Sequence, residues 1–475
     1  MSISADVLRS YRSIDEKTVD ELLAQEIKNN NKKIVVLDDD PTGVQTVHDI
    51  SVYTGWDADS LREAFAEENN LFYILTNSRG FTEEQTKEAH LEIADAVDRA
   101  AKEASRDYIF ISRSDSTLRG HYPLETRLLK ECYERNTGVK LDGEILCPFF
   151  KEGGRYTIGN VHYVKYGDEL VPAHETEFAK DKTFGYTAEN LPDYVEEKTA
   201  GEYKAKDVIS ISLEDIRSMD FDKIKSQLMS AKNFNKIIVN AIDYSDIKVF
   251  AVALFRAMNA GKMFMFRTAA ALVKVMGGVS DMPLLTRSDM IVNETENGGI
   301  IVVGSHTAKT TSQLECLKEI ADIEFIELDA NLVRDEEGFA NEVDRCLALE
   351  GEYIESGKTV CCYTSRSLVV ANTGDKEDEL RLSVRISDAV QSLVGRLPVT
   401  PSFVVAKGGI TSSDVGVKAL KVKRATVLGQ IKPGIPVWQT GSESKFPDTP
   451  YVIFPGNVGE ATTLREAVKE LMNKR

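Results

Sequence analysis

The chain has 475 residues, of which 42% are hydrophobic and 28% charged, and its formal net charge is -18. This length exceeds what one ordinary hydrophobic core supports, so we expect a globular protein of two domains. The strong negative charge argues against a nucleic-acid backbone or an anionic membrane as a partner, although local arginines can still bind a small anion.

Residues 1–27 contain acidic side chains and no apolar stretch of the kind found in secretory signals. Elsewhere, no apolar run approaches the roughly 20 residues that a membrane span requires. The six cysteines show no CxxC spacing and no metal-like pairing with the six histidines. These features predict a cytoplasmic protein with reduced thiols.

Short apolar runs alternate with longer helical stretches through the first part of the chain. Residues 84–104 are predicted to form a helix, because Ala89, Ile93, Ala96, Val97 and Ala100 fall on one face. The expected strands are residues 32–37, 71–76, 108–112, 144–150, 207–212, 236–240 and 263–266. Nearly continuous apolar strands separated by helices predict a parallel sheet that is covered on both faces.

A second series of strands is expected at residues 298–305, 323–328, 359–364, 402–409, 425–430, 436–441 and 451–456. Between the two series, residues 276–299 contain Gly, Pro, Asn and Asp but no long periodic run, and we place the domain boundary there. The sequence therefore predicts an α/β protein with domains at 1–285 and 286–475, each built on a mainly parallel sheet with flanking helices.

Three early strand ends of the first domain are polar: "LDDDPTG", "LTNSRG" and "ISRSDSTLRG". Ligands bind beyond the carboxyl ends of parallel strands, where these segments bring together Asp38, Asp39, Asp40, Thr42, Asn77, Ser78, Arg79, Arg113, Asp115, Ser116, Thr117 and Arg119. Carboxylates bind sugar hydroxyls, and arginines suit a substrate carboxylate, so the mixture favours a polyhydroxylated acid. Each segment also has a purely structural interpretation, "DPTG" as a turn and "SDST" as a helix cap.

The fourth strand is followed by "FFKEGGRYTIGNVHYV", in which we expect a glycine-rich loop that carries Arg155. The later "HETEF" resembles a zinc signature, but Phe178 occupies the position of the second histidine. Zinc is therefore not expected, and we assign no metal ligands.

The second domain has three glycine turns after strands, in "VVGSHTAKTTSQL", "FVVAKGGITSSDVGVKAL" and "FPGNVGE". Glycines allow backbone N–H groups close access to an anion, and a following helix favours negative charge there. The three turns together predict a nucleotide site. The segment "GEYIESGKT" is not a P-loop, since five residues separate Gly351 from Gly357 and a strand follows.

Together, these motifs resemble those of the four-carbon acid sugar kinase family. A D-D-x-T-G motif is matched by Asp39-Asp40-Pro41-Thr42-Gly43, K-x-D-S-T-L-R-G by "RSDSTLRG", and R-x-T-x-x-G by Arg155, Thr157 and Gly159. The C-terminal Gly-Ser turn, G-G-E-T loop and S-G-N-F-G motif are matched by Gly304-Ser305, by Gly408-Gly409-Ile410-Thr411 and by "PGNVG". The sequence departs from the family at Arg113, which replaces a lysine, and at Ile410, which replaces a glutamate.

The resemblance implies ATP-dependent phosphorylation of a terminal hydroxyl on a short sugar acid of about four carbons, in a cleft between the two domains. Asp40 would be the base, with Asp39 and Asp115 as comparable candidates. The implied substrate-binding residues are Thr42, Arg79, Arg113, Ser116, Arg119 and Arg155. The implied nucleotide-binding residues are Ser305, Gly408, Gly409, Ile410, Thr411 and Gly456. Mg²⁺ would accompany ATP, and the chain could form a homo-oligomer.

Two other functions fit the same residues. A sugar-acid lyase or dehydratase could use the aspartates and arginines without ATP, but it leaves the glycine turns unexplained. A non-catalytic sensor of a nucleotide or sugar acid would keep both pockets, and the replacement of the family glutamate by Ile410 mildly favours it.

Overall fold

The computed structural model describes residues 2–305, 307–366, 376–456 and 458–473. The chain divides into two compact units, the first comprising 1–43 and 55–280 and the second 44–54 and 281–475. The short segment 44–54 thus groups with the C-terminal part of the chain, which nothing in its sequence indicated. The assignment of residues 1–285 to the sugar acid and 286–475 to the nucleotide stays a prediction, as does a cleft between them.

The first unit is built on a parallel sheet of buried strands. Its strand order is β10 (Ile209–Ile211), β11 (Asn235–Val239), β6 (Gly143–Cys147), β12 (Phe264–Thr268), β5 (Tyr108–Arg113), β2 (Lys33–Asp38) and β4 (Leu71–Leu75). All residues of β2, β4, β5, β6 and β12 are buried, as apolar strands with helices on both faces should be. The carboxyl ends of β5, β2 and β4 are therefore neighbours.

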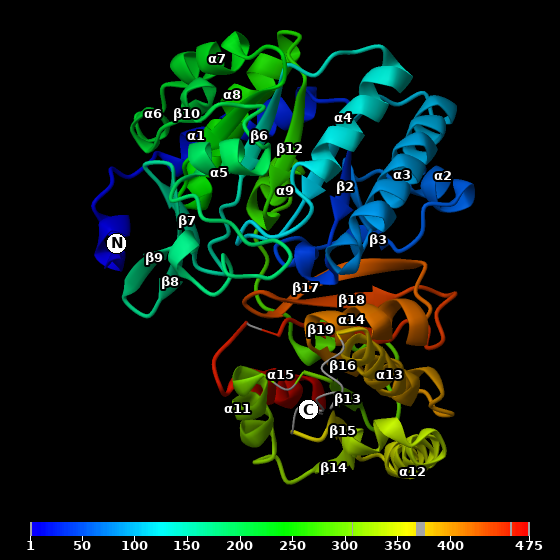
Figure 1. The fold of residues 1–475 in the computed structure, drawn as a ribbon. Coiled ribbons are helices and arrows are strands. Elements are labelled where there is room, and N and C mark those ends of the chain that lie inside the picture. Colours follow the sequence, from blue (N-terminus) through cyan, green and yellow to red (C-terminus); the bar gives the residue numbers. More distant parts are fainter. Residues whose placement is uncertain (1, 306, 367–375, 457, 474–475) are drawn as a thin grey trace. The chain divides into compact units, whose positions relative to one another are not determined.

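Helices cover both faces of this sheet (Figure 1). One group consists of α1 (Glu16–Asn29), α6 (Leu213–Arg217), α7 (Phe221–Ser230) and α8 (Tyr244–Asn259), and the other of α2 (Ala58–Ala66), α3 (Glu83–Glu103) and α4 (Leu124–Thr137). Two further helices are α5 (Leu191–Lys198) and α9 (Ala270–Met276). Helix α3 begins at a capping box formed by Thr82 and Gln85. Of its predicted apolar face, Ala96 is half-buried and the other four residues are buried.

A small antiparallel sheet follows β6 in the first unit. Its order is β1 (Ile3–Ser4), β9 (Glu169–Pro172), β8 (Val161–Tyr166) and β7 (Arg155–Ile158). The glycine-rich loop expected around Arg155 is therefore short, and Arg155 is itself the first residue of a strand. Because β7 and β8 pair in an antiparallel manner, backbone hydrogen bonds between the two strands set the positions from which their side chains project.

The second unit is built on a mixed sheet. Its order is β3 (Ile50–Tyr53), β17 (Arg424–Lys432), β18 (Ile435–Thr440), β19 (Pro450–Phe454), β16 (Val404–Lys407), β13 (Ile300–Val303), β15 (Thr359–Thr364) and β14 (Ile323–Leu328). The last five strands are parallel, whereas β17 runs antiparallel to both β3 and β18. The predicted two-domain α/β class, with mainly parallel strands and flanking helices, is confirmed.

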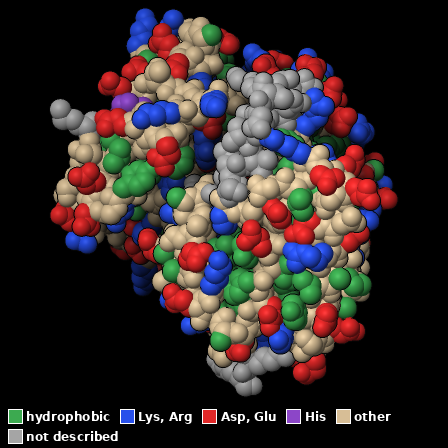
Figure 2. Space-filling model, turned by 60° about the horizontal axis from the view of Figure 1, so that its bottom comes forward, with side chains coloured by type: hydrophobic (Ala, Val, Ile, Leu, Met, Phe, Trp, Pro, Cys, Tyr) green, Lys and Arg blue, Asp and Glu red, His purple; other side chains and the backbone are tan. Residues whose placement is uncertain are grey.

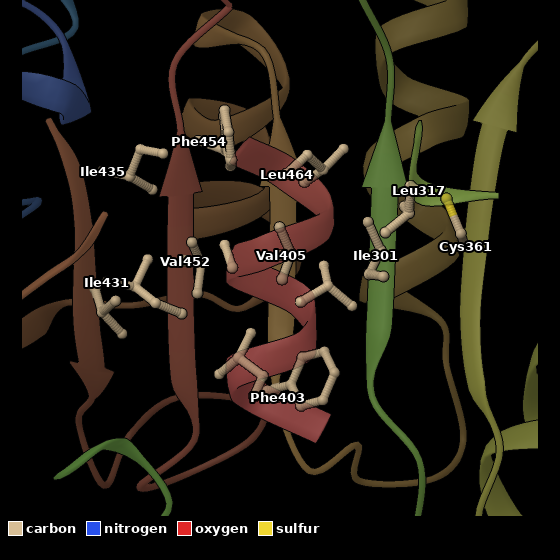
Figure 3. Close-up of a cluster of buried hydrophobic side chains, with 14 of the residues drawn as sticks. Ile301, Leu317, Cys361, Phe403, Val405, Ile431, Ile435, Val452, Phe454 and Leu464 are labelled. Atoms are coloured by element: carbon tan, nitrogen blue, oxygen red, sulfur yellow. The ribbon is translucent and has the colours of Figure 1, made fainter. Parts of the chain in front are cut away.

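One face of this sheet carries α10 (Arg287–Met290), α11 (Ala308–Leu317) and α15 (Thr463–Met472), whose apolar side chains join a common core. In Figure 3, Leu464 of α15 lies near Phe454, and Leu317 lies between Ile301 and Cys361 of two adjacent strands. The remaining helices are α12 (Glu336–Glu355), α13 (Lys376–Gly395) and α14 (Gly409–Asp414), and α13 packs against both of the others. The packed layer behind β13, β16 and β19 fixes the positions of their ends.

Among the described residues, no helix combines the length and the apolar character that crossing a membrane requires. All six cysteines are free thiols. Figure 2 shows Asp and Glu side chains scattered among Lys and Arg over the face that it presents.

Candidate functional site

The first polar site lies at the carboxyl ends of β2, β4 and β5, where aspartates and arginines pair. Arg79 donates from Nε and Nη2 to the two oxygens of Asp39, at 3.1 and 2.6 Å, and from Nη1 to Asp40 Oδ2 at 3.0 Å. Arg113 Nη1 lies 3.3 Å from Asp38 Oδ1 and 3.1 Å from Asp39 Oδ1. Two guanidinium groups therefore offset the repulsion among three successive carboxylates.

A fourth carboxylate, Asp115, belongs to the loop after β5. Arg119 binds it in a fork, with Nε 2.8 Å from Oδ2 and Nη2 3.2 Å from Oδ1. Asp115 also accepts hydrogen bonds from the hydroxyl and the backbone N–H of Thr117. Burial alone would raise the pKa of Asp115. The charges of Arg79 and Arg119, together with the hydrogen bonds from Arg119 and Thr117, instead hold this pKa well below its usual value. The "SDST" segment forms a turn around Asp115 rather than a helix cap.

Within the aspartate cluster, the carboxyl groups outnumber their directly paired guanidinium groups by one. The cluster comprises four carboxylates and three guanidinium groups: Asp38, Asp39, Asp40, Asp115, Arg79, Arg113 and Arg119. Burial raises the pKa of Asp38 to about 8, against the opposing charge of Arg113. Although Asp40 is also desolvated, the charges of Arg79 and Arg113 and its hydrogen bonds with Thr42 hold its pKa below the usual value. Burial thus favours the protonated form of Asp38, and it also raises the pKa of Asp39, whereas the pairing of Asp40 favours its ionised form.

Exposure separates the three consecutive aspartates further. The side chains of Asp38 and Asp39 are 1% and 3% exposed, whereas that of Asp40 is 16% exposed. Asp40 Oδ1 accepts the backbone N–H of Thr42 at 2.8 Å, so "DPTG" is a turn that also fixes a carboxylate. At Gly43, a Cβ atom would lie 2.1 Å from the Asp38 carboxylate, so only glycine fits.

The remaining predicted residues of the first unit differ in their surroundings. Arg113 is 5% exposed at its side chain and contacts aspartates, which makes it a buried counter-ion in this structure. Arg119 and Arg155 lie over the ring of Phe178, with their Cζ atoms 5.1 and 5.6 Å from its centroid. Nε of Arg155 is buried and has no hydrogen-bond partner among the described residues.

His162, on β8, links the hairpin to the loop that carries Ser116. Its Nε2 lies 2.7 Å from the carbonyl oxygen of Ser116, and its Nδ1 lies 3.0 Å from the Thr157 hydroxyl. A carbonyl can only accept, so the imidazole donates from Nε2 and accepts at Nδ1. Burial lowers its pKa to about 4, which keeps the ring neutral. This bridge gives the threonine of R-x-T-x-x-G a structural role.

Sequence reasoning did not identify His162 or Phe178 as site residues, nor Arg267 on β12. Arg267 Nη2 donates to the backbone carbonyl of Arg119 at 3.0 Å and fixes the same loop from a neighbouring strand. The polar end of "MFMFRT", beside the other polar strand ends, was a signal that could have identified Arg267. No comparable sequence pattern marks His162, because its partner Ser116 lies in a distant part of the chain.

The second polar site lies at the carboxyl ends of β19, β16, β13 and β15, four adjacent strands of the second unit. The three predicted glycine turns follow β13, β16 and β19, so the structure brings Ser305, the 408–411 loop and Gly456 to one sheet edge. Asn457 and His306 of these motifs lie outside the described residues. Arg366, after β15, was not predicted; it donates from Nη1 to the Ser305 carbonyl at 2.8 Å and from Nη2 to the Thr311 hydroxyl at 2.7 Å.

The turns after β13 and β16 meet at Thr411. A Cβ atom at Gly304 would lie 2.4 Å from Thr411 Oγ1, so glycine is required for this approach. The backbone N–H of Gly408 donates to the Phe454 carbonyl at 2.9 Å, which joins the second turn to the third. Ile410 is 74% exposed, in contrast to its buried neighbour Thr411. The carboxyl edge of the second sheet is thus lined by glycine turns, and Ile410 is an exposed apolar side chain among them.

The second site also contains a buried lysine that the sequence interpretation overlooked. Lys407, the last residue of β16, is 0% exposed, and its Nζ donates to the carbonyl oxygens of Pro455 at 2.6 Å and Gly456 at 3.4 Å. No cluster of three or more His, Cys, Asp or Glu side chains suited to a metal ion occurs in the described ranges.

Comparisons with known proteins agree with this division of the sites. A family model described as "Sugar-binding N-terminal domain" matches residues 34–276, and one described as "Nucleotide-binding C-terminal domain" matches residues 300–464. No curated protein matches the chain. The two family matches therefore define a protein with a sugar-binding N-terminal domain and a nucleotide-binding C-terminal domain.

Two solved structures share the fold over their full lengths. One is the Haemophilus influenzae protein HI1011, of the DUF1537 family, at 18% identity, covering 92% of this chain with a TM-score of 0.59. The other, from Salmonella typhimurium LT2, was provisionally called a tRNA synthase; at 13% identity it covers 93% of this chain with a TM-score of 0.61. With both of its domain models matched, the chain belongs to the four-carbon acid sugar kinase family.

Proposed function

We propose that the protein is an ATP-dependent kinase that phosphorylates a terminal hydroxyl of a short sugar acid of about four carbons. The observation that carries this proposal is the pair of polar strand edges: a carboxylate and guanidinium cluster in the sugar-binding domain, and glycine turns in the nucleotide-binding domain. A cytoplasmic location and a homo-oligomeric state remain predictions.

Asp40 is our candidate for the base. It is ionised and is the most exposed of the three consecutive aspartates, so it can accept a hydrogen bond from the attacking hydroxyl. In the transfer, the hydroxyl proton passes to Asp40 as the substrate oxygen bonds to the γ-phosphorus, and the bond to the β,γ-bridging oxygen breaks to release ADP. Asp39 is saturated by two guanidinium groups, and Asp115 by Arg119 and Thr117, which makes both weaker candidates.

Arg119 and Arg155 are our candidates for binding the substrate carboxylate. The ring of Phe178 supports both guanidinium groups, and the buried Arg155 Nε still lacks an acceptor among the described residues. A planar carboxylate suits a guanidinium fork in geometry and in charge. Arg79 is bound to Asp39 and Asp40, so we expect it to act on the transferring phosphoryl group only while it also holds these carboxylates.

On the nucleotide side, Ser305, Gly408, Gly409, Thr411 and Gly456 would surround the phosphates. Backbone N–H groups in glycine turns bind phosphate oxygens without a side chain in the way. Mg²⁺ would enter bound to ATP, where it neutralises charge that develops on the phosphate oxygens.

The side chain at position 410 favours a second candidate function, that of a non-catalytic nucleotide sensor. Ile410 stands where the family usually has glutamate, and its apolar side chain is 74% exposed at the nucleotide edge. A sensor that binds a nucleotide without turnover would need no carboxylate there.

The deciding experiment is an ADP-release assay with Mg-ATP over a panel of three- to six-carbon aldonic and oxo-acids. We expect release with one acid, and we expect Asp40→Asn to abolish it while ATP still binds. Asp59→Asn, at a surface side chain that is 91% exposed, is the matched control. Near-normal turnover by Asp40→Asn would refute the base, and nucleotide binding without turnover across the panel would favour the sensor.

A further inference from the structure

A buried lysine without a carboxylate partner among the described residues occupies the nucleotide edge. The register places Lys407 between Val303 of β13 and Phe454 of β19, the last residues of the two neighbouring strands. Its Nζ lies 4.2 Å from the centroid of the Phe454 ring and donates to two carbonyl oxygens of the turn after β19. In the described ranges, no Asp or Glu forms an ion pair with it.

This arrangement is costly for the isolated fold. Burial of an ammonium group without a counter-ion disfavours its charged form, and two carbonyl dipoles and one ring face offset that only in part. Burial, with the nearby charge of Lys309, lowers the pKa of Lys407 to about 7. An aliphatic side chain would fill the same position in the sheet without this cost, so packing alone does not account for the lysine.

The surroundings of Lys407 supply a use for the charge. Gly408 and Gly409 follow it directly, and the carbonyl oxygens that it binds belong to Pro455 and Gly456 of the third glycine turn. Lys309, the charged group that acts on it from another element, lies in the first turn of α11, after the first glycine turn. Two cationic side chains therefore gather at the edge where the phosphates of a nucleotide are expected.

We propose that Lys407 supplies the buried positive charge of the nucleotide site, and that binding of the nucleotide polyphosphate is accompanied by uptake of one proton at its Nζ. This inference rests on the proposed nucleotide site of the kinase. Lys407 acts as a positioning residue, because it holds the turn after β19 and stabilises the phosphates through its charge rather than by contact.

The direction of the pH dependence follows from the pKa of Lys407 in the protein without nucleotide, which is about 7. At about pH 6 most Lys407 side chains therefore already carry their proton, and at about pH 8 most do not. A bound polyanion stabilises the ammonium form and raises that pKa. Uptake should therefore be small at about pH 6 and approach one proton per nucleotide at about pH 8.

The test is isothermal titration of the full-length protein with Mg-ADP, in buffers of different ionisation enthalpy, which yields the number of protons taken up. We expect nearly one proton at about pH 8 for the wild type and none for Lys407→Met, checked for folding by circular dichroism. Lys309→Met, at an exposed position, should shift the uptake profile to higher pH, because it removes the charge that lowers the Lys407 pKa.

The outcomes separate this inference from the proposed function. Nucleotide binding by the wild type without proton uptake at about pH 8 would overturn the role of Lys407 and leave the kinase proposal standing. A folded Lys407→Met that still takes up a proton, or a Lys309→Met profile that does not move, would also overturn it. Failure of the wild type to bind any nucleotide would overturn both.

Discussion

Arg79 and Asp39 form a two-bond fork, from Nε to Oδ2 at 3.1 Å and from Nη2 to Oδ1 at 2.6 Å. The carboxylate of Asp39 is 3% exposed, so this guanidinium and that of Arg113 together replace almost all of its hydration. The remaining guanidinium nitrogen of Arg79, Nη1, donates to Asp40 Oδ2. One side chain from the end of β4 therefore fixes both carboxylates of the D-D-x-T-G motif at the end of β2.

Loss of Arg79 should destabilise the first unit strongly. Arg79→Met leaves a buried carboxylate without its main counter-ion, and we expect the free energy of unfolding to fall by about 3 kcal/mol. Urea denaturation measures this loss. Adding Asp39→Asn to the same chain should restore part of the stability, because the amide needs no counter-ion; strictly additive losses would contradict the pairing.

His162 should make stability sensitive to mild acid. Its pKa in the folded chain is about 4, below the ordinary value of 6.5, so between these values the unfolded chain binds a proton that the folded chain does not. Stability should thus fall as the pH is lowered through this window. In urea denaturation, the wild type should lose about 2 kcal/mol more than His162→Gln between pH 6.5 and about pH 5. Equal losses in both proteins would refute the assignment.

Arg155 should control acid binding more than the chemical step. We expect Arg155→Gln to raise KM for the sugar acid by about 10-fold or more with a smaller change in kcat, since it removes a charge-assisted hydrogen bond to the bound carboxylate. Phe178→Leu should give the same pattern more weakly, through loss of the ring beneath two guanidinium groups. Steady-state kinetics with the acid found in the panel tests both, with the surface variant Arg62→Gln as the control. A fall in kcat alone would place Arg155 in the chemistry instead.

The close approach of two glycine turns should be essential for nucleotide binding. Gly304→Ala places a Cβ atom 2.4 Å from Thr411 Oγ1, so the turns must separate, and we expect the affinity for Mg-ADP to fall by about 10-fold. Titration calorimetry gives the constants. Thr411→Ala in the same chain removes the clashing hydroxyl and should recover part of the affinity relative to Gly304→Ala. No recovery would mean that the glycine serves another purpose.

Much of the fold was predictable because apolar strands and amphipathic helices are local patterns. The polar ends after residues 37, 75 and 112 could be placed at one edge from the amino-acid sequence alone, since parallel strands end on the same side of a sheet. The pairing of Arg79 with Asp39 rather than with a substrate was not predictable. Several arginines reach the same edge, and their choice of partner depends on side-chain distances that no pattern encodes.

Other features were missed for specific physical reasons. β17 and β18 are apolar runs like the rest, and their antiparallel direction depends on a tight turn at Gly434. Lys407 interrupts an apolar strand at its last residue, where a lysine usually reaches water. The four residues of β3 are too few to show which sheet they join.

Residues 44–54 bear on how this protein could be divided by genetic engineering. The chain enters the second unit at Val44, leaves it at Thr54 and returns at Asp281. A fragment that starts at Asp281 therefore lacks β3, the strand that pairs with Arg424–Val427 of β17, and leaves those backbone groups open to other chains. Exchange of the nucleotide-binding part between relatives consequently needs two grafts, 44–54 and 281–475, because one fusion point would divide a single sheet between two parents.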